Sequence, residues 1–132
     1  MKLYLDSSAL VKLVKHESGS IPLTAFLRRH RDDGRVTSAL ARAEVVRAVA
    51  GGGEPAVAHA RRVLARVDQI NVDRQLLDDA AILVPGTILR SLDAIHLASA
   101  RAIGPELRSV VTYDGRMHDA AIAIGLAVAA PA

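Results

Sequence analysis

Four acidic residues of this chain stand where a folded protein could use them for chemistry. Asp6 and Asp114 each come directly after a short apolar segment that predicts a β-strand. Glu44 and Asp93 each fall in the first turns of a segment with helical apolar spacing. Asp93 lies beside apolar residues, where a charge is costly unless a cation pairs with it. Because no Lys or Arg follows Asp93 by one turn, we expect its partner to come from elsewhere in the fold or to be a metal ion.

Together the four acids indicate a divalent cation. In a parallel sheet the carboxyl ends of the strands meet at one edge, so Asp6, Glu44, Asp93 and Asp114 are expected to lie close together. Carboxylates gathered in this way repel one another unless some are protonated or a cation neutralises them. Mg²⁺ and Mn²⁺ prefer carboxylate oxygens, whereas zinc favours Cys or closely spaced His ligands, which this chain lacks. Such a site would support metal-assisted hydrolysis of a phosphodiester.

Each acid also has an ordinary structural interpretation. Asp6 can cap a helix, and Asp93 can be an acidic helix start that the helix dipole favours. Glu44 can be a surface residue paired with Arg47, three positions further along the same helix. The type of each residue therefore leaves both interpretations open, and it is the order and spacing of the four acids that favours a shared site.

The elements that must position these acids alternate along the chain. Strands are predicted at Lys2–Leu5, Arg35–Thr37, within Val67–Val72, at Ser109–Thr112 and at Leu126–Val128. Helices are predicted between them, at 9–14, 21–31, 39–49, 54–65, 74–83, from Arg90 onward, and at 118–124. This alternation predicts an α/β fold in which a central parallel sheet lies between two helical layers. Residues 1–132 are expected to form a single domain.

Some local features can be predicted as well. Ser7 or Ser8 is expected to cap the first helix. Ala43, Val46 and Val49 (or Ala50) are expected on the buried face of the helix that contains Glu44. Pro85-Gly86 is expected to break the chain before the Asp93 helix.

Composition excludes several classes of protein. The chain has 132 residues and no cysteine, which rules out disulfides, thiolate metal sites and cysteine nucleophiles and fits a cytoplasmic location. Aromatic residues make up only 2%, which argues against binding of single strands by base stacking. No apolar run is long enough to cross a membrane, and no signal peptide is expected. The net charge of +3, contributed largely by arginines, favours a polyanionic partner.

Four segments resemble the motifs of a PIN domain and, more narrowly, of the VapC toxins of VapBC toxin–antitoxin pairs. They occur in the family's order along the whole chain, and they are Asp6-Ser7-Ser8-Ala9-Leu10-Val11-Lys12, Thr37-Ser38-Ala39 leading to Glu44, Leu92-Asp93-Ala94-Ile95-His96-Leu97-Ala98, and Val111-Thr112-Tyr113-Asp114. The resemblance implies a PIN-like three-layer α/β/α sandwich. It also implies an endoribonuclease that depends on Mg²⁺ or Mn²⁺, forms a homodimer and is neutralised by a cognate VapB-type antitoxin.

The resemblance also assigns roles to residues. By position in the matching motifs, the catalytic acids and metal ligands would be Asp6, Glu44, Asp93 and Asp114. Ser7 and Thr112 would donate hydrogen bonds to these carboxylates, and Arg90 could reach a substrate phosphate. His96 is expected to be packed or hydrogen-bonded rather than catalytic.

Two other functions compete with the ribonuclease. A phosphotransfer enzyme could use Asp6 as its nucleophile, but such enzymes usually need a second acid nearby or a Lys at a later strand end, and no Lys follows Lys15. Alternatively, the chain could be a non-catalytic metal- or partner-binding module of the same fold, in which the acids hold only a structural ion or an Arg from a partner.

Overall fold

A five-stranded sheet is the centre of the protein. The structure is a computed structural model that describes residues 1–84 and 89–132, so the break expected at Pro85-Gly86 lies outside the described residues. All strands are parallel and lie in the order β3-β2-β1-β4-β5. The strands are β1 (Lys2–Leu5), β2 (Gly34–Ser38), β3 (Asp68–Ile70), β4 (Leu107–Val111) and β5 (Val128–Ala129). The predicted parallel sheet is therefore confirmed, although β5 is shorter than expected.

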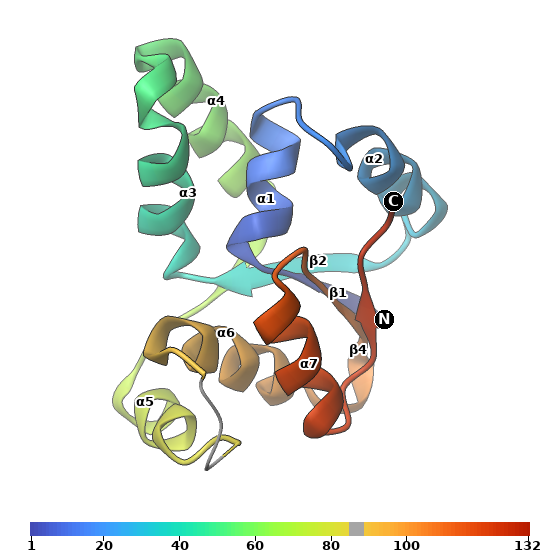
Figure 1. Cartoon of the computed structure of the whole chain (residues 1–132), viewed down its shortest axis with the longest axis vertical. Coiled ribbons are helices and arrows are strands. Elements are labelled where there is room, and N and C mark those ends of the chain that lie inside the picture. The colour runs from blue at the N-terminus through green and yellow to red at the C-terminus, as the bar shows by residue number, and fades with distance from the viewer. Residues whose placement is uncertain (85–88) are drawn as a thin grey trace.

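Helices cover both faces of the sheet. In Figure 1, α1 to α4 lie on one side of it and α5 to α7 on the other, which confirms the predicted three-layer α/β/α architecture. The helices are α1 (Ser7–Val14), α2 (Ser20–Arg29), α3 (Ala41–Val49), α4 (Glu54–Leu64), α5 (Arg74–Ala81), α6 (Ser91–Ala102) and α7 (Gly115–Ala123). No helix in the described parts of the chain combines the length and the apolar character that crossing a bilayer requires.

The central strand contributes side chains to hydrophobic clusters on both faces of the sheet. Successive side chains of a strand point to opposite faces of its sheet. Leu3 and Leu5 accordingly pack in the cluster beneath α1 to α4, whereas Tyr4 packs in the cluster beneath α6. All three side chains are fully buried. Strand β1 is thus covered by helices on both faces, which holds the residue at its carboxyl end in a fixed position.

The strand order creates one crevice at the carboxyl edge of the sheet. From β1 the chain proceeds outward to β2 and β3, and then it returns to the other side of β1 to form β4 and β5. The connections that leave β1 and β4 therefore run in opposite directions. Ligands of open parallel sheets bind at such a reversal, outside the carboxyl ends of the strands. The residues that follow β1 and β4 are consequently the first candidates for a functional site.

Three local predictions were wrong. Asp6, rather than Ser7 or Ser8, caps α1, because its own carboxylate accepts the hydrogen bond of the Ala9 amide. Helix α3 begins two residues later than expected, and Ala41 and Val45 are buried instead of Ala43 and Val46, although Val49 is buried as predicted. Helix α7 begins at Gly115, three residues before its predicted start, because Asp114 accepts hydrogen bonds from the first amides of the helix.

An ion-pair cluster ties the opposite edge of the sheet together. Asp33, which directly precedes β2, pairs with Arg108 of β4 and lies 3.5 Å from the terminal amine of Met1. The hydrogen bond from Arg108, reinforced by the two positive charges, holds the pKa of the Asp33 carboxyl below its usual value. At this edge the carboxylate of Asp33 thus has cationic partners close by.

Candidate active site

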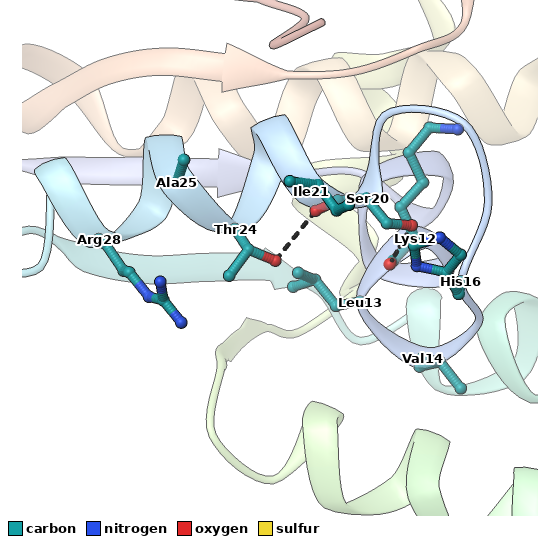
Figure 2. A pocket seen from close by; sticks show the side chains of 9 residues that line it. All are labelled: Lys12, Leu13, Val14, His16, Ser20, Ile21, Thr24, Ala25 and Arg28. Carbon is teal, nitrogen blue, oxygen red and sulfur yellow. Dashed lines mark hydrogen bonds between the residues drawn. The ribbon is translucent and has the colours of Figure 1, made fainter.

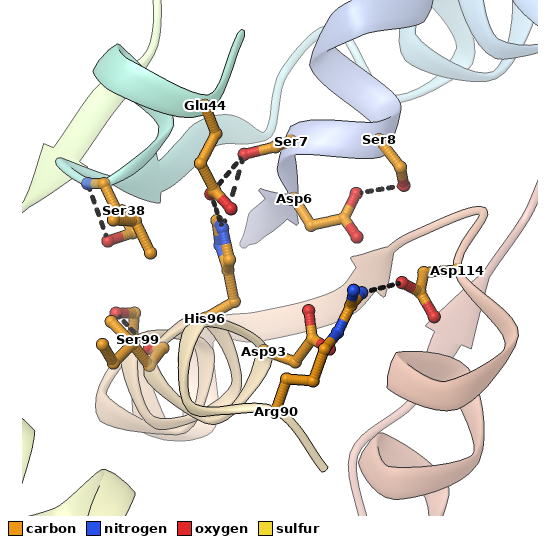
Figure 3. Close-up of polar contacts among 12 residues, drawn as sticks. Asp6, Ser7, Ser8, Ser38, Glu44, Arg90, Asp93, His96, Ser99 and Asp114 are labelled. Atoms are coloured by element: carbon orange, nitrogen blue, oxygen red, sulfur yellow. Dashed lines mark hydrogen bonds and ion pairs between the residues drawn. The ribbon is translucent and has the colours of Figure 1, made fainter. Parts of the chain in front are cut away.

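All four predicted acids lie at the carboxyl edge of the sheet (Figure 3). Asp6 follows β1, and Asp114 follows β4 after a short connection. Glu44 lies in the first turn of α3, and Asp93 lies in the first turn of α6. The predicted location at one edge is therefore confirmed. Each acid, however, has a different set of partners.

Asp6 is a buried carboxylate held by neutral donors. Its side chain is almost inaccessible, since the residue is only 2% exposed. One oxygen accepts hydrogen bonds from the Ser8 hydroxyl at 2.6 Å and the Ala9 amide at 3.0 Å, and the other accepts the Thr112 hydroxyl at 2.5 Å. Burial raises the pKa of Asp6, and these three hydrogen bonds reduce the rise without cancelling it. The site thus contains a negative charge that its immediate donors do not neutralise.

Glu44 belongs to a hydrogen-bonded chain that runs into the core. Its Oε1 accepts the Ser7 hydroxyl at 2.8 Å and lies 2.5 Å from His96 Nε2. The other ring nitrogen of His96 lies 2.7 Å from the hydroxyl of Tyr4, which is fully buried. If the Tyr4 hydroxyl donates to Nδ1, the imidazole presents its Nε2–H to Glu44.

These hydrogen bonds favour the charged form of Glu44. Burial by itself would raise the pKa of Glu44, but the hydrogen bond of His96, together with the Ser7 hydroxyl, lowers it overall. His96 is 1% exposed and lies on α6, one turn after Asp93. The expectation that His96 is packed and hydrogen-bonded rather than reactive agrees with these contacts. Its connection to Glu44 across the site was not anticipated.

Asp93 and Asp114 share one arginine. Arg90 Nε lies 3.2 Å from Asp93 Oδ2, and Arg90 Nη2 lies 3.6 Å from Asp114 Oδ2 (Figure 3). Asp114 also accepts hydrogen bonds from the Arg116 and Met117 amides at the start of α7. Arg90 precedes Asp93 by three residues, so the partner of Asp93 is local. The expectation of a partner from elsewhere in the fold was wrong, because it considered only the turn that follows Asp93, whereas a metal ion at Asp93 stays a prediction.

The donor set suits a hard cation, although the acids do not form one tight cluster. Among residues 1–84 and 89–132, no three Asp, Glu, His or Cys side chains converge closely enough to hold an ion as they stand. Arg90 lies between two of the acids instead. The buried Asp6 carboxylate nevertheless retains a charge whose donors are neutral, and carboxylate oxygens are the ligands that Mg²⁺ and Mn²⁺ prefer. The residues therefore fit such an ion if Arg90 moves aside.

The hydrogen-bond donors expected beside the acids are present. Thr112 donates to Asp6 and Ser7 donates to Glu44, as the sequence predicted. Thr112 Oγ1 also accepts the amide of Asp114 at 3.1 Å, which links the two acids that follow β1 and β4. Tyr4 and Ser8 were not predicted to contribute. Ser8 lies only two residues after Asp6, so the spacing allowed this hydrogen bond without predicting it.

A separate groove lies between α1 and α2 (Figure 2). It has a volume of about 480 Å³, and its lining combines apolar residues such as Leu13 and Ile21 with the basic Lys12 and Arg28. None of the four acids lines it. This groove is therefore a surface distinct from the carboxylate site.

Comparison with known proteins agrees with the motif analysis. A family model described as "PIN domain" matches residues 3–123. Ribonuclease VapC46 of Mycobacterium tuberculosis is 51% identical to this chain over 98% of the chain and 97% of its own length. Ribonuclease VapC35 of the same organism is 44% identical over 98% of this chain and 96% of its own length.

Solved structures of low sequence identity have the same fold. The crystal structure of Mycobacterium tuberculosis VapC20, titled a sarcin-ricin loop cleaving toxin, has a TM-score of 0.77 and 18% identity, and the match covers 98% of this chain and 99% of that one. A VapBC2 chain from Rickettsia felis, solved bound to a promoter DNA fragment, has a TM-score of 0.71 and 16% identity, with 98% of both chains covered. With the family match and the close relatives, these findings establish that the chain belongs to the PIN domain family and, within it, to the VapC group.

Proposed function

We propose that this chain is a divalent-metal-dependent endoribonuclease and the toxin of a type II toxin–antitoxin pair. The observation that carries the proposal is the burial of two carboxylates, Asp6 at 2% and Asp93 at 7% exposure, at the carboxyl edge of a parallel sheet. Burying a charge is costly, and a binding function explains why the fold accepts that cost. The names of the VapC relatives support the ribonuclease activity.

Mg²⁺ or Mn²⁺ is the proposed ion, with Asp6 and Asp93 as its main ligands and Glu44 and Asp114 as additional acids of the site. When bound, such an ion activates a water molecule and stabilises the charge that develops on the scissile phosphate. The protein's own residues prepare the ligands. Ser8 and Thr112 orient the Asp6 carboxylate, and His96 and Ser7 orient Glu44.

The proposed substrate is RNA. Exposed arginines occur on two elements that carry or follow the site acids, with Arg42 and Arg47 on α3, the helix of Glu44, and Arg116 two residues after Asp114. Arginine can hydrogen-bond two phosphate oxygens at once, and contacts of this kind make nucleic-acid binding depend strongly on salt. We therefore expect RNA binding by this chain to weaken steeply as the salt concentration rises.

We further propose that the free toxin is a homodimer of the cytoplasm and that a VapB-type antitoxin neutralises it. Both partners are inferred from the VapC group, in which a VapBC assembly has been solved for Rickettsia felis. Large apolar side chains on the surface, such as Ile21 at 72% and Ile122 at 56% exposure, are available for such contacts. Light scattering of the free chain tests the dimer, and loss of RNA cleavage on adding the co-encoded VapB-type protein tests the antitoxin.

Cleavage of RNA by the purified, refolded chain tests the activity. Cellular RNA is incubated with the protein in Mn²⁺ or Mg²⁺ and, in parallel, in EDTA. We expect internal cleavage only with the metal, and we expect Asp6→Asn, Glu44→Gln and Asp93→Asn to abolish it. Asp68→Asn, an equivalent change at an exposed residue of β3, should cleave like the wild type. Cleavage that survives in all three site variants would refute the proposal.

The alternatives make different predictions. A non-catalytic module of this fold would bind Mn²⁺ or a partner through the same acids but would leave RNA intact under every condition. An aspartyl-phosphotransfer enzyme would form an acyl-phosphate on Asp6, a residue whose carboxylate is buried and engaged by three donors. A nucleophile must reach its substrate, so this arrangement favours a ligand role for Asp6.

A further inference from the structure

Arg90 occupies the position in the site where a cation is most favoured. Its guanidinium lies between Asp93 Oδ2, at 3.2 Å, and Asp114 Oδ2, at 3.6 Å (Figure 3). The two acids come from different elements, the first turn of α6 and the connection from β4 to α7. Two neighbouring carboxylates repel each other unless a positive charge lies between them. In this structure the guanidinium supplies that charge.

The surroundings of Arg90 are negative on several sides. The hydrogen bond to Asp93, and then the charges of Asp93, Asp114 and Glu44, raise the pKa of the Arg90 guanidinium. Three of the four acids of the site thus act on the same side chain. A divalent ion placed there would be attracted by the same three groups, and it carries twice the charge. The two cations therefore cannot both take the favourable position without repelling each other.

The Arg90 side chain is also free to move away from the two carboxylates. Its side chain is 65% exposed, in contrast to 10% for the Asp93 side chain that it contacts. It lies in the segment that precedes α6, outside the three hydrophobic clusters. A swing toward solvent would break the ion pairs with the buried Asp93 and the partly exposed Asp114, and it would take no residue out of the hydrophobic clusters. The Asp93 carboxylate, held by the first turn of α6, would remain in place.

We propose that Arg90 competes with the divalent cation for the carboxylates of Asp93 and Asp114, so that the side chain must be displaced when the ion binds. This inference rests on the proposed metal-dependent activity. Arg90 then neutralises the two acids in the metal-free protein and lowers the affinity of the site for the ion. Asp6, whose donors are neutral, is outside this competition.

Calorimetric titration of Mn²⁺ into the metal-stripped full chain tests the competition. An exposed ion pair shifts an equilibrium by up to about fivefold. Because two pairs are lost, Arg90→Gln should bind Mn²⁺ about 3- to 25-fold more tightly than the wild type. Arg101→Gln removes the same charge from an exposed position in the last turn of the same helix and should leave the affinity unchanged.

The possible results separate this inference from the proposed function. Equal affinity of Arg90→Gln and wild type would overturn the competition while leaving a metal site intact. Weaker binding by Arg90→Gln would also overturn it, because Arg90 would then be holding the acids in place for the ion. If neither protein binds Mn²⁺, both the competition and the metal-dependent activity are wrong.

A second measurement follows Arg90 directly. The Nε–H signal of Arg90 in an NMR spectrum is identified by its absence from Arg90→Gln. Because Nε contacts Asp93, titration with diamagnetic Mg²⁺ should move this signal toward the position of an unpaired arginine. The Arg101 signal should remain where it is. An Arg90 signal that stays unchanged while Mg²⁺ is shown to bind would contradict displacement, whatever the affinities are.

Discussion

Replacing Asp6 with Asn should make the metal-free protein more stable. The Asp6 carboxylate is 2% exposed, and burial raises its pKa despite three hydrogen bonds, so these donors do not fully offset the cost of the charge. Asn has the same shape and caps helices as well as Asp does. Its carbonyl oxygen can keep the donors Ser8 and Ala9, and its amide can donate to the Thr112 hydroxyl.

Stabilising substitutions of this kind typically contribute about 0.5–2 kcal/mol. The loss of the favourable interaction between the charge and the α1 dipole, worth about 0.3–1 kcal/mol, reduces this stabilisation. The sign follows from the direction of the pKa shift, which already combines desolvation with the hydrogen bonds. We therefore expect Asp6→Asn to melt above the wild type in EDTA at pH 7, by about 2–8 °C for each kcal/mol.

The extra stability of Asp6→Asn over the wild type should decrease as the pH falls. The pKa of Asp6 is higher in the folded protein than the ordinary value of 3.8. The wild type therefore has the full penalty only above its raised folded pKa, and it has none well below 3.8. The difference in free energy of unfolding between Asp6→Asn and wild type should shrink as the pH falls toward 4.

A bound metal should reverse the order of the two proteins. An ion present at about 100 times its dissociation constant stabilises the folded state by about 2.7 kcal/mol. If Asp6 is a ligand, Mn²⁺ should raise the melting temperature of the wild type well above that of Asp6→Asn. Thermal melts followed by circular dichroism, in EDTA and in Mn²⁺, measure both effects, and Asp68→Asn at an exposed site is the matched control. A wild type more stable than Asp6→Asn in EDTA would refute the reasoning about the buried charge.

Two further predictions concern groups away from the metal ligands. Tyr4→Phe removes the hydroxyl that lies 2.7 Å from His96 Nδ1 in the core, so it should lower the free energy of unfolding by about 1–3 kcal/mol in urea titrations, and an unchanged value would show that His96 is oriented by other groups. Asp33→Asn should destabilise the protein at pH 7, because the Arg108 hydrogen bond and charge lower the pKa of Asp33 and so stabilise the folded state above pH 3.8. That contribution is lost as the pH falls through the lowered pKa. Urea titrations should therefore show a smaller difference in free energy of unfolding between Asp33→Asn and wild type at pH 3 than at pH 7. An equal difference at both pH values would contradict this role of Asp33.

The architecture could be predicted because alternation of strands and helices leaves few possible folds. Apolar runs such as Lys2–Leu5 and Ser109–Thr112, separated by helical patterns, favour a parallel sheet with helices on both faces. Parallel strands then bring Asp6 and Asp114 to one edge without any knowledge of distances. The buried face of α3 was predicted less well. Ala and Val occur on several sides of that helix, and a start two residues later rotates the face that meets the sheet.

The partners of the acids could not be predicted in the same way. Tyr4 and His96 are 92 positions apart, and their contact depends on how α6 crosses the face of the sheet. Sequence spacing contains no information about such a crossing. The contact of Arg90 with Asp93 is different, because Arg90 is the residue directly before α6 and lies only three positions from Asp93 in the first turn. That pair could have been predicted if the turn before Asp93 had been considered as well as the turn after it.

The four acids are neutralised to different extents, which supports different roles for them in the site. Glu44 is compensated by His96, while Asp93 and Asp114 are compensated by Arg90, a side chain exposed enough to leave. Asp6 has neutral donors and the deepest burial of the four. If all four charges served stability, each would be expected to have a fixed cation, as Asp33 has in Arg108. A site that must admit an ion needs at least one charge without a fixed partner and at least one partner that can be displaced, and Asp6 and Arg90 meet these two requirements.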